Sequence, residues 1–456
     1  MHCGTGSKND GGWLNSQLAW PWAQPVSDCE GVGVNFDPTD PALRRRPPRP
    51  QLARRDVLRG GLWLSIGFGA APLLAACGGN GNSPTSGAAP YPLARPDSPV
   101  TLPLRDSNPP IDSGLDPESG GAFKILNYDQ YMAPGVMQTF GEQHGVEVQV
   151  TPYSNYDEML AKIRAPGASF DLVFPGPSVL SKMVYTELLQ PLNHSYVPNL
   201  ENVWPEYQDP WYDRGAQYTV PYTLYGTGVL YRADRVSNVP ENGYDLIWDE
   251  QYAGKVYLLD DMQEAIGMSM LRNNVSTDIN TSDPDVVHEA TDSLIELIDL
   301  VQIKANVNAY SEVPEGTATI HQAWSGDPIA GQYYLPKGET PDVLGYWRPE
   351  DPTQYVIGSD NIAIPKSATK PVLSHLLIND LLDNEIGLRN FGWNGYQPPL
   401  TKLSARYLID QGYIPENLMN AVVVPEDFDT GLTFYEVSPS TEALWREAWS
   451  GFKAGG

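Results

Sequence analysis

The order of apolar and polar residues along the chain predicts strands and helices in alternation. Short apolar runs over 123–128, 146–153 and 170–174 are typical of strands, and apolar residues at helical spacing follow each run, over 134–144, 156–164 and 178–189. Ser178 is the residue type that commonly caps a helix, so we expect it to begin the third helix. Strands that alternate with helices favour an α/β fold built on a parallel sheet.

The pattern continues through the second half of the chain, with strands predicted over 256–259 and 361–365 and helices over 283–304, 370–389 and 440–453. Open α/β sheets bind their ligands at the carboxyl ends of the strands. That rule directs attention to the loops over 127–131, 175–178, 260–264, 324–327, 358–360 and 395–397.

A different pattern precedes these elements. Arg54 and Arg55 are followed by a mostly apolar stretch over 62–74 and then by Ala75-Ala76-Cys77. A basic start, a short apolar core and small residues are typical of a secretory signal, and paired arginines resemble a twin-arginine signal. The run Leu74–Cys77 resembles a bacterial lipobox, so we expect Cys77 to be lipidated. The alternative is a buried amphipathic hairpin that carries a chance cysteine.

The same region sets the expected domain organisation at the start of the chain. Residues 1–77 are expected to be an export segment, of which residues 1–53 show no period and are either an extension of the signal or a start site placed too early. Residues 78–121 are rich in Gly, Pro, Ser and Asp, a composition that predicts a flexible tether. A lipid, a tether and a folded body would hold the protein at an extracytoplasmic membrane surface.

The charge of the chain is strongly acidic, with a formal net charge of −27. Residues 1–77 hold eight of the 29 Lys and Arg residues and six of the 56 Asp and Glu residues, so residues 78–456 carry −29. Nucleic acids and anionic membrane surfaces bind basic faces, so neither is an expected partner of the body. An acidic surface also keeps a protein soluble, and solubility by itself accounts for much of the negative charge.

Sequence signatures of metal or covalent chemistry are lacking. The only cysteines are Cys3, Cys29 and Cys77, without a C-x-x-C pair, which gives no support to a zinc or iron–sulfur site. H-E-x-x-H, G-x-S-x-G, P-loop and G-x-G-x-x-G motifs do not occur. We therefore expect no catalytic residue, no metal and no cofactor. The acidic group Asp260, Asp261 and Glu264 leaves three interpretations open: glycosidase carboxylates, cation-binding groups, or the start of a helix.

Several short motifs, in order from about residue 123 to 453, resemble those of the bacterial spermidine/putrescine-binding proteins, a branch of the extracellular solute-binding proteins. They are Asn127-Tyr128-Asp129-Gln130-Tyr131 with Pro134-Gly135, Phe170-Asp171-Leu172-Val173, Val220-Pro221-Tyr222, Leu259-Asp260-Asp261-x-x-Glu264, Trp324-Ser325-Gly326-Asp327, Asp360 before Ile362–Pro365, and Gly395-Tyr396 with Pro398. Each motif is weak alone, and their order and spacing carry the resemblance.

The resemblance implies a two-lobe periplasmic-binding-protein fold of type II, in which each lobe is a mixed sheet flanked by helices and the ligand lies in the cleft between the lobes. The first lobe would comprise 122–226 and 359–400, and the second 227–358 and 401–456. It further implies a monomer that is not an enzyme and that delivers its ligand to an ABC permease in the membrane. The implied ligand is a di- or polyamine such as putrescine or spermidine.

The resemblance also assigns the candidate site. Because ammonium groups need ionised acceptors and the methylene chain needs apolar walls, the acids are expected at the ammonium ends and the aromatic rings around the chain. The acids are Asp261, Glu264, Asp327 and Asp360, the aromatic residues are Tyr128, Tyr131, Trp324 and Tyr396, and Ser178 completes the set. For several of these residues an ordinary structural role, as core aromatic, helix cap or turn former, stays open.

Three departures from the family pattern affect the ligand more than the fold. The first aromatic residue is Tyr128 in place of Trp, Ser178 stands where spermidine-preferring members carry an aromatic residue, and Gly358 replaces an aromatic residue. Asp327 together with Ser178 is closer to putrescine-type members. Other functions stay open: a binding protein of the same fold for a sugar or an amino-acid derivative, a secreted carbohydrate-active enzyme that uses Asp261 or Glu264 with Asp360, and a surface lipoprotein without a ligand.

Overall fold

The computed structural model describes residues 89–455. The expected export segment, Cys77 and the first part of the expected tether lie outside the described residues. Among the helices that are described, none is long and apolar enough to cross a membrane.

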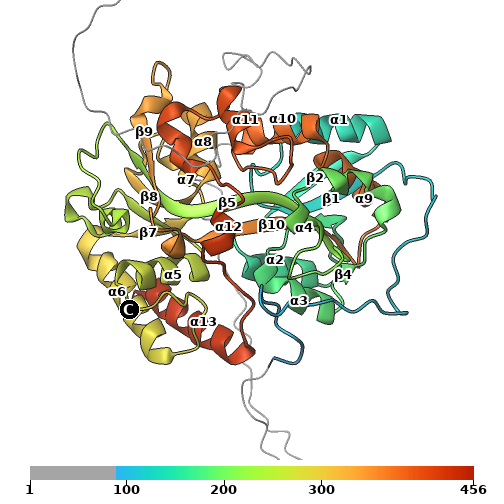
Figure 1. Cartoon of the computed structure of the whole chain (residues 1–456), viewed down its shortest axis with the longest axis horizontal. Helices are drawn as coiled ribbons and strands as arrows, with labels where there is room; N and C mark the ends of the chain where they lie inside the picture. Colours follow the sequence, from blue (N-terminus) through green and yellow to red (C-terminus); the bar gives the residue numbers. More distant parts are fainter. Residues whose placement is uncertain (1–88, 456) are drawn as a thin grey trace, which may run out of the picture. The chain divides into compact units, whose positions relative to one another are not determined.

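The centre of the described region is a ten-stranded mixed sheet in the order β2-β1-β3-β10-β5-β8-β6-β7, with β4 paired to β10 and β9 to β5 (Figure 1). The strands are β1 (Ala122–Asn127), β2 (Glu147–Pro152), β3 (Leu172–Val173), β4 (Leu189–Gln190), β5 (Thr219–Arg232), β6 (Val256–Leu259), β7 (Lys304–Asn306), β8 (Ile320–Trp324), β9 (Leu344–Trp347) and β10 (Ile357–Pro365). β1 pairs in parallel with β2 and β3, and β6 with β7 and β8, as the alternation of strands and helices predicts.

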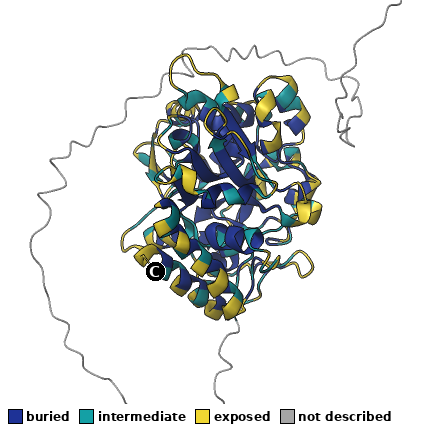
Figure 2. Ribbon diagram, turned by 90° about the vertical axis from the view of Figure 1, so that its left-hand side faces the viewer, coloured by how far each residue is buried: buried dark blue, intermediate teal, exposed yellow. Residues whose placement is uncertain are grey.

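Helices cover the sheet, and their outward surfaces are exposed while most strands are buried; β2 and β7, at the two ends of the strand order, are the more exposed ones (Figure 2). The helices are α1 (Pro134–His144), α2 (Tyr156–Arg164), α3 (Pro177–Tyr185), α4 (Pro205–Gln208), α5 (Met262–Arg272), α6 (Pro284–Val301), α7 (Ala309–Glu312), α8 (Gly326–Gly331), α9 (Pro371–Leu381), α10 (Asn384–Asn394), α11 (Ala405–Asp410), α12 (Asp427–Thr430) and α13 (Pro439–Ala454).

β5 joins two halves of the sheet. Its first part, up to Gly226, pairs antiparallel with β10, and from Thr227 onward it pairs with β8 and β9. One buried cluster lies around β1, β3, α2 and α3, and another lies among α5, α6 and α13. The change of partner after Gly226 coincides with the expected end of the first lobe segment, although the four lobe boundaries themselves stay a prediction.

Three predicted elements differ from the structure. α3 begins at Pro177 with Gly176 at the cap position, so Ser178 is not the helix cap. Residues 370–389 form parts of two helices, because Asp383 accepts hydrogen bonds from the amides of Glu385 and Ile386 and begins α10 there. Residues 358–360, expected as a loop, lie inside β10, because their backbone pairs with β5 over Thr223–Tyr225.

The prediction of a flexible tether over 78–121 is also wrong for the part that the structure describes. Residues 89–121, which we call the N-terminal belt, lie against the folded body, and Ala94, Val100 and Leu102 are buried. The amide of Asn108 donates to the carbonyl of Leu189 at 2.8 Å. The belt is poor in apolar residues, yet it docks because a few apolar side chains and many hydrogen bonds to the body replace a core of its own.

Candidate functional site

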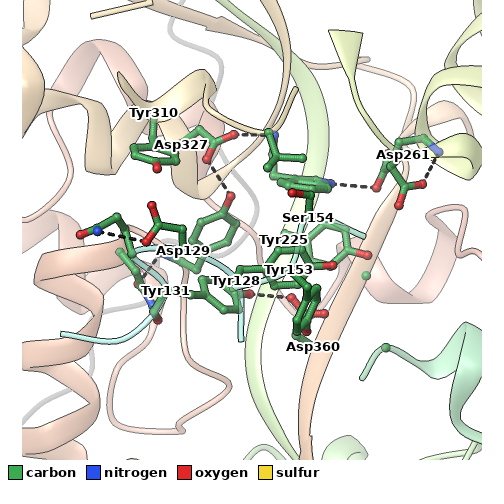
Figure 3. Close-up of a pocket in the computed structure, with 18 of the residues that line it drawn as sticks. Tyr128, Asp129, Tyr131, Tyr153, Ser154, Tyr225, Asp261, Tyr310, Asp327 and Asp360 are labelled. Carbon is green, nitrogen blue, oxygen red and sulfur yellow. Dashed lines mark hydrogen bonds between the residues drawn. The ribbon is translucent and has the colours of Figure 1, made fainter. Parts of the chain in front are cut away.

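A cavity of about 140 Å³ lies where the loops and strands of the two halves of the sheet meet (Figure 3). All nine residues expected to bind ligand line this cavity: Tyr128, Tyr131, Ser178, Asp261, Glu264, Trp324, Asp327, Asp360 and Tyr396. The structure therefore brings together the whole predicted set, from segments up to 268 positions apart in the sequence. Contact with a ligand remains a prediction for each of them.

Asp360 stands in β10 and is almost fully buried. Its two carboxylate oxygens accept hydrogen bonds from the hydroxyls of Tyr131, at 2.6 Å, and Tyr156, at 2.8 Å. Burial raises the pKa of Asp360 to about 6, although these hydrogen bonds act in the opposite direction. A carboxylate held in place by two phenols is oriented for a cation, because each oxygen keeps a further lone pair.

Glu264 lies in the first turn of α5 and is 4% exposed. The indole nitrogen of Trp324 donates to its Oε1 at 2.8 Å, whereas its Oε2 has no hydrogen-bond partner among the described residues. Burial, followed by the negative charge of Asp261, raises the pKa of Glu264 to about 8. A buried acceptor without a partner is costly, so this oxygen is suited to a donor from a bound molecule.

Asp261 is the N-cap of α5, where its Oδ1 accepts from the amides of Gln263 at 2.9 Å and Glu264 at 3.1 Å. The interpretation of the acidic group as a helix start is therefore correct for Asp261, and the same side chain also lines the cavity. Burial raises the pKa of Asp261 to about 6. Its neighbour Asp260 instead pairs with Lys453 at 2.8 Å.

Asp327 lies in α8 and is 2% exposed. Its Oδ1 accepts from the hydroxyl of Tyr396 at 2.7 Å and its Oδ2 from the amide of Trp324 at 3.2 Å. Burial raises the pKa of Asp327 to about 7. The carboxylate thus stabilises a turn and faces the cavity at the same time.

Aromatic rings form the walls between these acids. Tyr128 lies edge-on to Tyr131 at 5.5 Å between ring centroids and to Trp324 at 6.2 Å. Tyr131 lies edge-on to Tyr396 at 5.1 Å. The rings provide apolar surface and negative faces, both of which suit a chain of methylene groups that ends in cations.

Several lining residues escaped the sequence prediction, and the clearest are Tyr153, Tyr156, Tyr225, Tyr310 and Tyr334. Tyr153 and Tyr156 immediately follow β2, so the rule that ligands bind at the carboxyl ends of strands would have found them. Tyr225 lies inside the long strand β5, where no local signal separates a cavity residue from a core residue.

The arrangement offers hydrogen-bond acceptors that suit cations. Four carboxyl groups and several phenols surround one narrow space, and each carboxyl already has a hydrogen bond that fixes its position. Within residues 89–455, His, Cys, Asp and Glu side chains do not gather in a group of three or more that would hold a metal ion.

Such a site in a mixed α/β sheet whose two halves are joined by the long strand β5 is typical of the two-lobe solute-binding proteins. The sequence profile of the bacterial extracellular solute-binding proteins matches residues 135–411, and the chain belongs to this family. The two-lobe α/β fold and the family resemblance inferred from the sequence are both confirmed.

Three known proteins give the comparison more detail. The chain is 24% identical over 327 residues to spermidine/putrescine-binding periplasmic protein 1 of Haemophilus influenzae, which covers 71% of this chain and 82% of the relative. It is 26% identical over 286 residues to the spermidine/putrescine-binding periplasmic protein of Escherichia coli K12, covering 62% and 79%. The substrate-binding protein of a spermidine/putrescine ABC transporter from Streptococcus pneumoniae has a similar fold, with a TM-score of 0.57, 23% identity, and coverage of 74% and 99%.

Proposed function

We propose that this protein captures a di- or polyamine outside the cytoplasm and delivers it to an ABC importer. The observation that carries the proposal is the set of four carboxyl groups, Asp261, Glu264, Asp327 and Asp360, that line one narrow aromatic cavity. A neutral sugar does not require four acids, so a di- or polyamine matches the site better than a sugar does. The names of the similar proteins from Haemophilus and Escherichia support the same ligand class.

Binding would be driven by the pairing of two kinds of buried charge, the ammonium groups of the ligand and the carboxyl groups of the cavity. Ammonium groups have pKa values like that of Lys and are charged at neutral pH. Moving such a charge out of water costs several kcal/mol unless an ionised partner and further acceptors replace its hydration. In the empty cavity the carboxyl groups are disfavoured as anions by burial, as their raised pKa values indicate. A dication relieves this cost, so ligand and ionised carboxylates stabilise each other.

The proposed capture step is a hinge closure. The site takes residues from both halves of the sheet, with Asp360 and Tyr131 on one side of the change in β5 pairing and Glu264 and Asp327 on the other. A ligand that bridges the halves favours the closed form, in which the cavity is formed. The closed form is then the state that the permease recognises, and no catalytic step is required.

The proposed location rests on the N-terminal sequence. Export through the segment 1–77 and lipidation of Cys77 would hold the protein at the outer side of the cytoplasmic membrane. Expression of the full chain and of Cys77→Ser in a bacterium that processes lipoproteins tests this point. We expect the wild-type chain in the membrane fraction, with a mass that includes acyl groups, and the variant in the soluble extracytoplasmic fraction; the same fraction for both would contradict lipidation at Cys77.

A thermal-shift screen of the chain from residue 78 onward tests the ligand class. We expect putrescine, cadaverine or spermidine to raise the unfolding midpoint, because a ligand that binds only the folded state stabilises it. Maltose and glutamate serve as the sugar and amino-acid comparisons. A shift with either of these and none with an amine would move the function to the same fold with another ligand, and turnover of an oligosaccharide would favour the enzyme.

A further inference from the structure

Tyr225 is a cavity residue to which the preceding proposal gives no role. Its ring lies edge-on to Trp324 at 6.1 Å between centroids, and its hydroxyl makes no hydrogen bond to any residue in the described part of the chain. In Figure 3 the side chain stands between Asp261 and Asp360, with Asp327 on the other side of the view. A phenol that enters an acidic cavity without a partner has a free acceptor and a free donor.

Gly358 explains why Tyr225 occupies this position. The two residues are direct neighbours in the antiparallel pairing of β5 and β10. A Cβ atom at position 358 would lie 2.5 Å from both Cζ and Oη of Tyr225, closer than such atoms approach in proteins. The hydroxyl end of the Tyr225 ring therefore fills the space that a side chain at 358 would take.

Two other acceptors are available in the same part of the cavity. Glu264 contributes its buried Oε2, which has no hydrogen-bond partner within residues 89–455. Asp360 contributes carboxylate oxygens that are oriented by Tyr131 and Tyr156. After burial, the negative charges of Glu264 and Asp360 are the largest causes that raise the pKa of Tyr225, so the phenol stands within their field. A primary ammonium has three N–H donors, and these three side chains come from α5, β10 and β5.

We infer that Tyr225, seated over Gly358, accepts the third hydrogen bond of a primary ammonium group whose other two go to Glu264 and Asp360. This inference rests on the proposed amine-binding function and adds a specificity to it. These three acceptors together select an amine end with three N–H groups. Alkylation of the nitrogen removes the N–H donor that would bond to the phenol of Tyr225. The missing side chain at Gly358 leaves room for the Tyr225 ring. The position of that ring sets how deep in the cavity the ammonium group lies.

The chain offers a matched control. Tyr231 lies on the same strand, faces Gly345 across the β5–β9 pairing, and would also be contacted by a Cβ atom on its glycine. Tyr231 does not line the cavity. Removal of a hydroxyl at 225 and at 231 therefore compares two similar tyrosine–glycine pairs, of which only one has a predicted ligand.

Calorimetric titration of putrescine into the wild-type chain, Tyr225→Phe and Tyr231→Phe tests the contact. A hydrogen bond to a charged group predicts about a tenfold to hundredfold loss of affinity for Tyr225→Phe and less than a twofold change for Tyr231→Phe. N,N,N′,N′-tetramethylputrescine, with one N–H at each end, is expected to bind weakly and to be insensitive to Tyr225→Phe. Equal losses with both ligands would show a merely structural role and overturn the inference.

A second measurement does not depend on the ligand. Gly358→Ala is expected to lower the thermal unfolding midpoint in the wild-type background and to lower it much less together with Tyr225→Ala, because the clash partner is then absent. Additive effects would overturn the seating of Tyr225 over Gly358. If the wild type binds putrescine and Tyr225→Phe binds it equally well, the inference fails and the proposed function stands. If the wild type binds no amine, the proposed function fails, and with it the ammonium contact, while this pair of variants still decides the seating.

Discussion

Tyr396 donates a hydrogen bond of 2.7 Å to Asp327, and the two residues belong to segments that the sequence assigns to different lobes. Their contact shows how the cavity is built: each acid in it is oriented by a donor that often comes from a distant part of the chain. Trp324 orients Glu264 and Tyr131 orients Asp360, in each case within one of the lobes that the sequence assigns. Of these three contacts, the bond between Tyr396 and Asp327 is the one that joins the two assigned lobes.

Asp360 is expected to be the acid whose loss affects binding most. Asp360→Asn removes the charge and keeps the shape, and it leaves an ammonium without an ionised partner in a buried place, at a cost of about 3–5 kcal/mol. The dissociation constant for putrescine should therefore rise at least about a hundredfold in calorimetry. Asp342→Asn, at an exposed acid outside the cavity, is the control. An unchanged dissociation constant for Asp360→Asn would remove Asp360 from the site.

The raised pKa of Glu264 predicts how the stability of the empty protein depends on pH. Its folded pKa of about 8 exceeds the value of about 4 in an unfolded chain, so the folded state holds more protons between these values. Stability is then present at acid pH and is lost as the pH rises through the folded pKa. The variant Glu264→Gln, which resembles the protonated acid, should come closest to the wild type in thermal midpoint at about pH 4, where Glu264 is protonated in both the folded and the unfolded chain.

At pH 9 the two proteins should differ, with Glu264→Gln more stable than the empty wild type by roughly 2–4 °C. An identical dependence on pH for both proteins would contradict the assignment. Putrescine should offset this loss of stability at high pH, because it binds the form of the protein in which Glu264 is ionised. Its affinity for the wild type should therefore rise from pH 5.5 to pH 8, with release of protons on binding that calorimetry in buffers of different ionisation enthalpy detects.

An ion pair outside the cavity is expected to contribute to closure. Arg446 in α13 binds Asp157 in α2, with Nη2 2.9 Å from Oδ1, and these helices pack in different buried clusters. Both side chains are about half exposed, so the pair is worth at most about 1 kcal/mol. Arg446→Gln should weaken putrescine binding by up to about fivefold, more at low salt than at high salt.

The control for this pair is Arg389→Gln, which breaks the pair with Glu385 inside one helix and should leave binding unchanged. The double reversal Asp157→Arg with Arg446→Asp should recover most of the affinity. Equal effects of Arg446→Gln and Arg389→Gln would mean that the contact between α2 and α13 plays no part in closure.

The docked belt predicts a contrast between two leucines. Leu102 is 1% exposed and Leu104 is 55% exposed, although both lie in the same segment. Leu102→Ala should lower the free energy of unfolding by about 2–5 kcal/mol, and Leu104→Ala by less than about 0.5 kcal/mol, as measured by urea denaturation. If both changes have the same small effect, residues 89–121 are a free tether as the composition predicts.

The sequence predicted which residues line the cavity better than it predicted some of the elements. Several of these residues, such as Tyr131, Asp261 and Glu264, follow a strand or begin a helix, where local pattern and family motifs both apply. All nine line the cavity, although Asp360 lies inside β10. Tyr225 could not be found in this way, because its exposure to the cavity depends on the small size of its cross-strand neighbour Gly358.

The errors in the elements have a similar cause. The break between α9 and α10 arises from the capping bonds of Asp383, a local competition that apolar periodicity does not detect. The strand over 358–360 and the docked belt both depend on partners far along the chain, namely β5 and the carbonyl of Leu189. Composition and periodicity describe what a segment does alone, and here the tertiary partners decide.

Isothermal titration calorimetry with putrescine and spermidine at pH 7.5 asks whether the four buried acids and the aromatic walls hold a linear amine. We expect one site per chain with a dissociation constant of about 1 μM or tighter, equivalent to about −8 kcal/mol, for at least one of the two amines. No heat from either amine, from a chain that is folded by circular dichroism and that responds to maltose or glutamate, would contradict it.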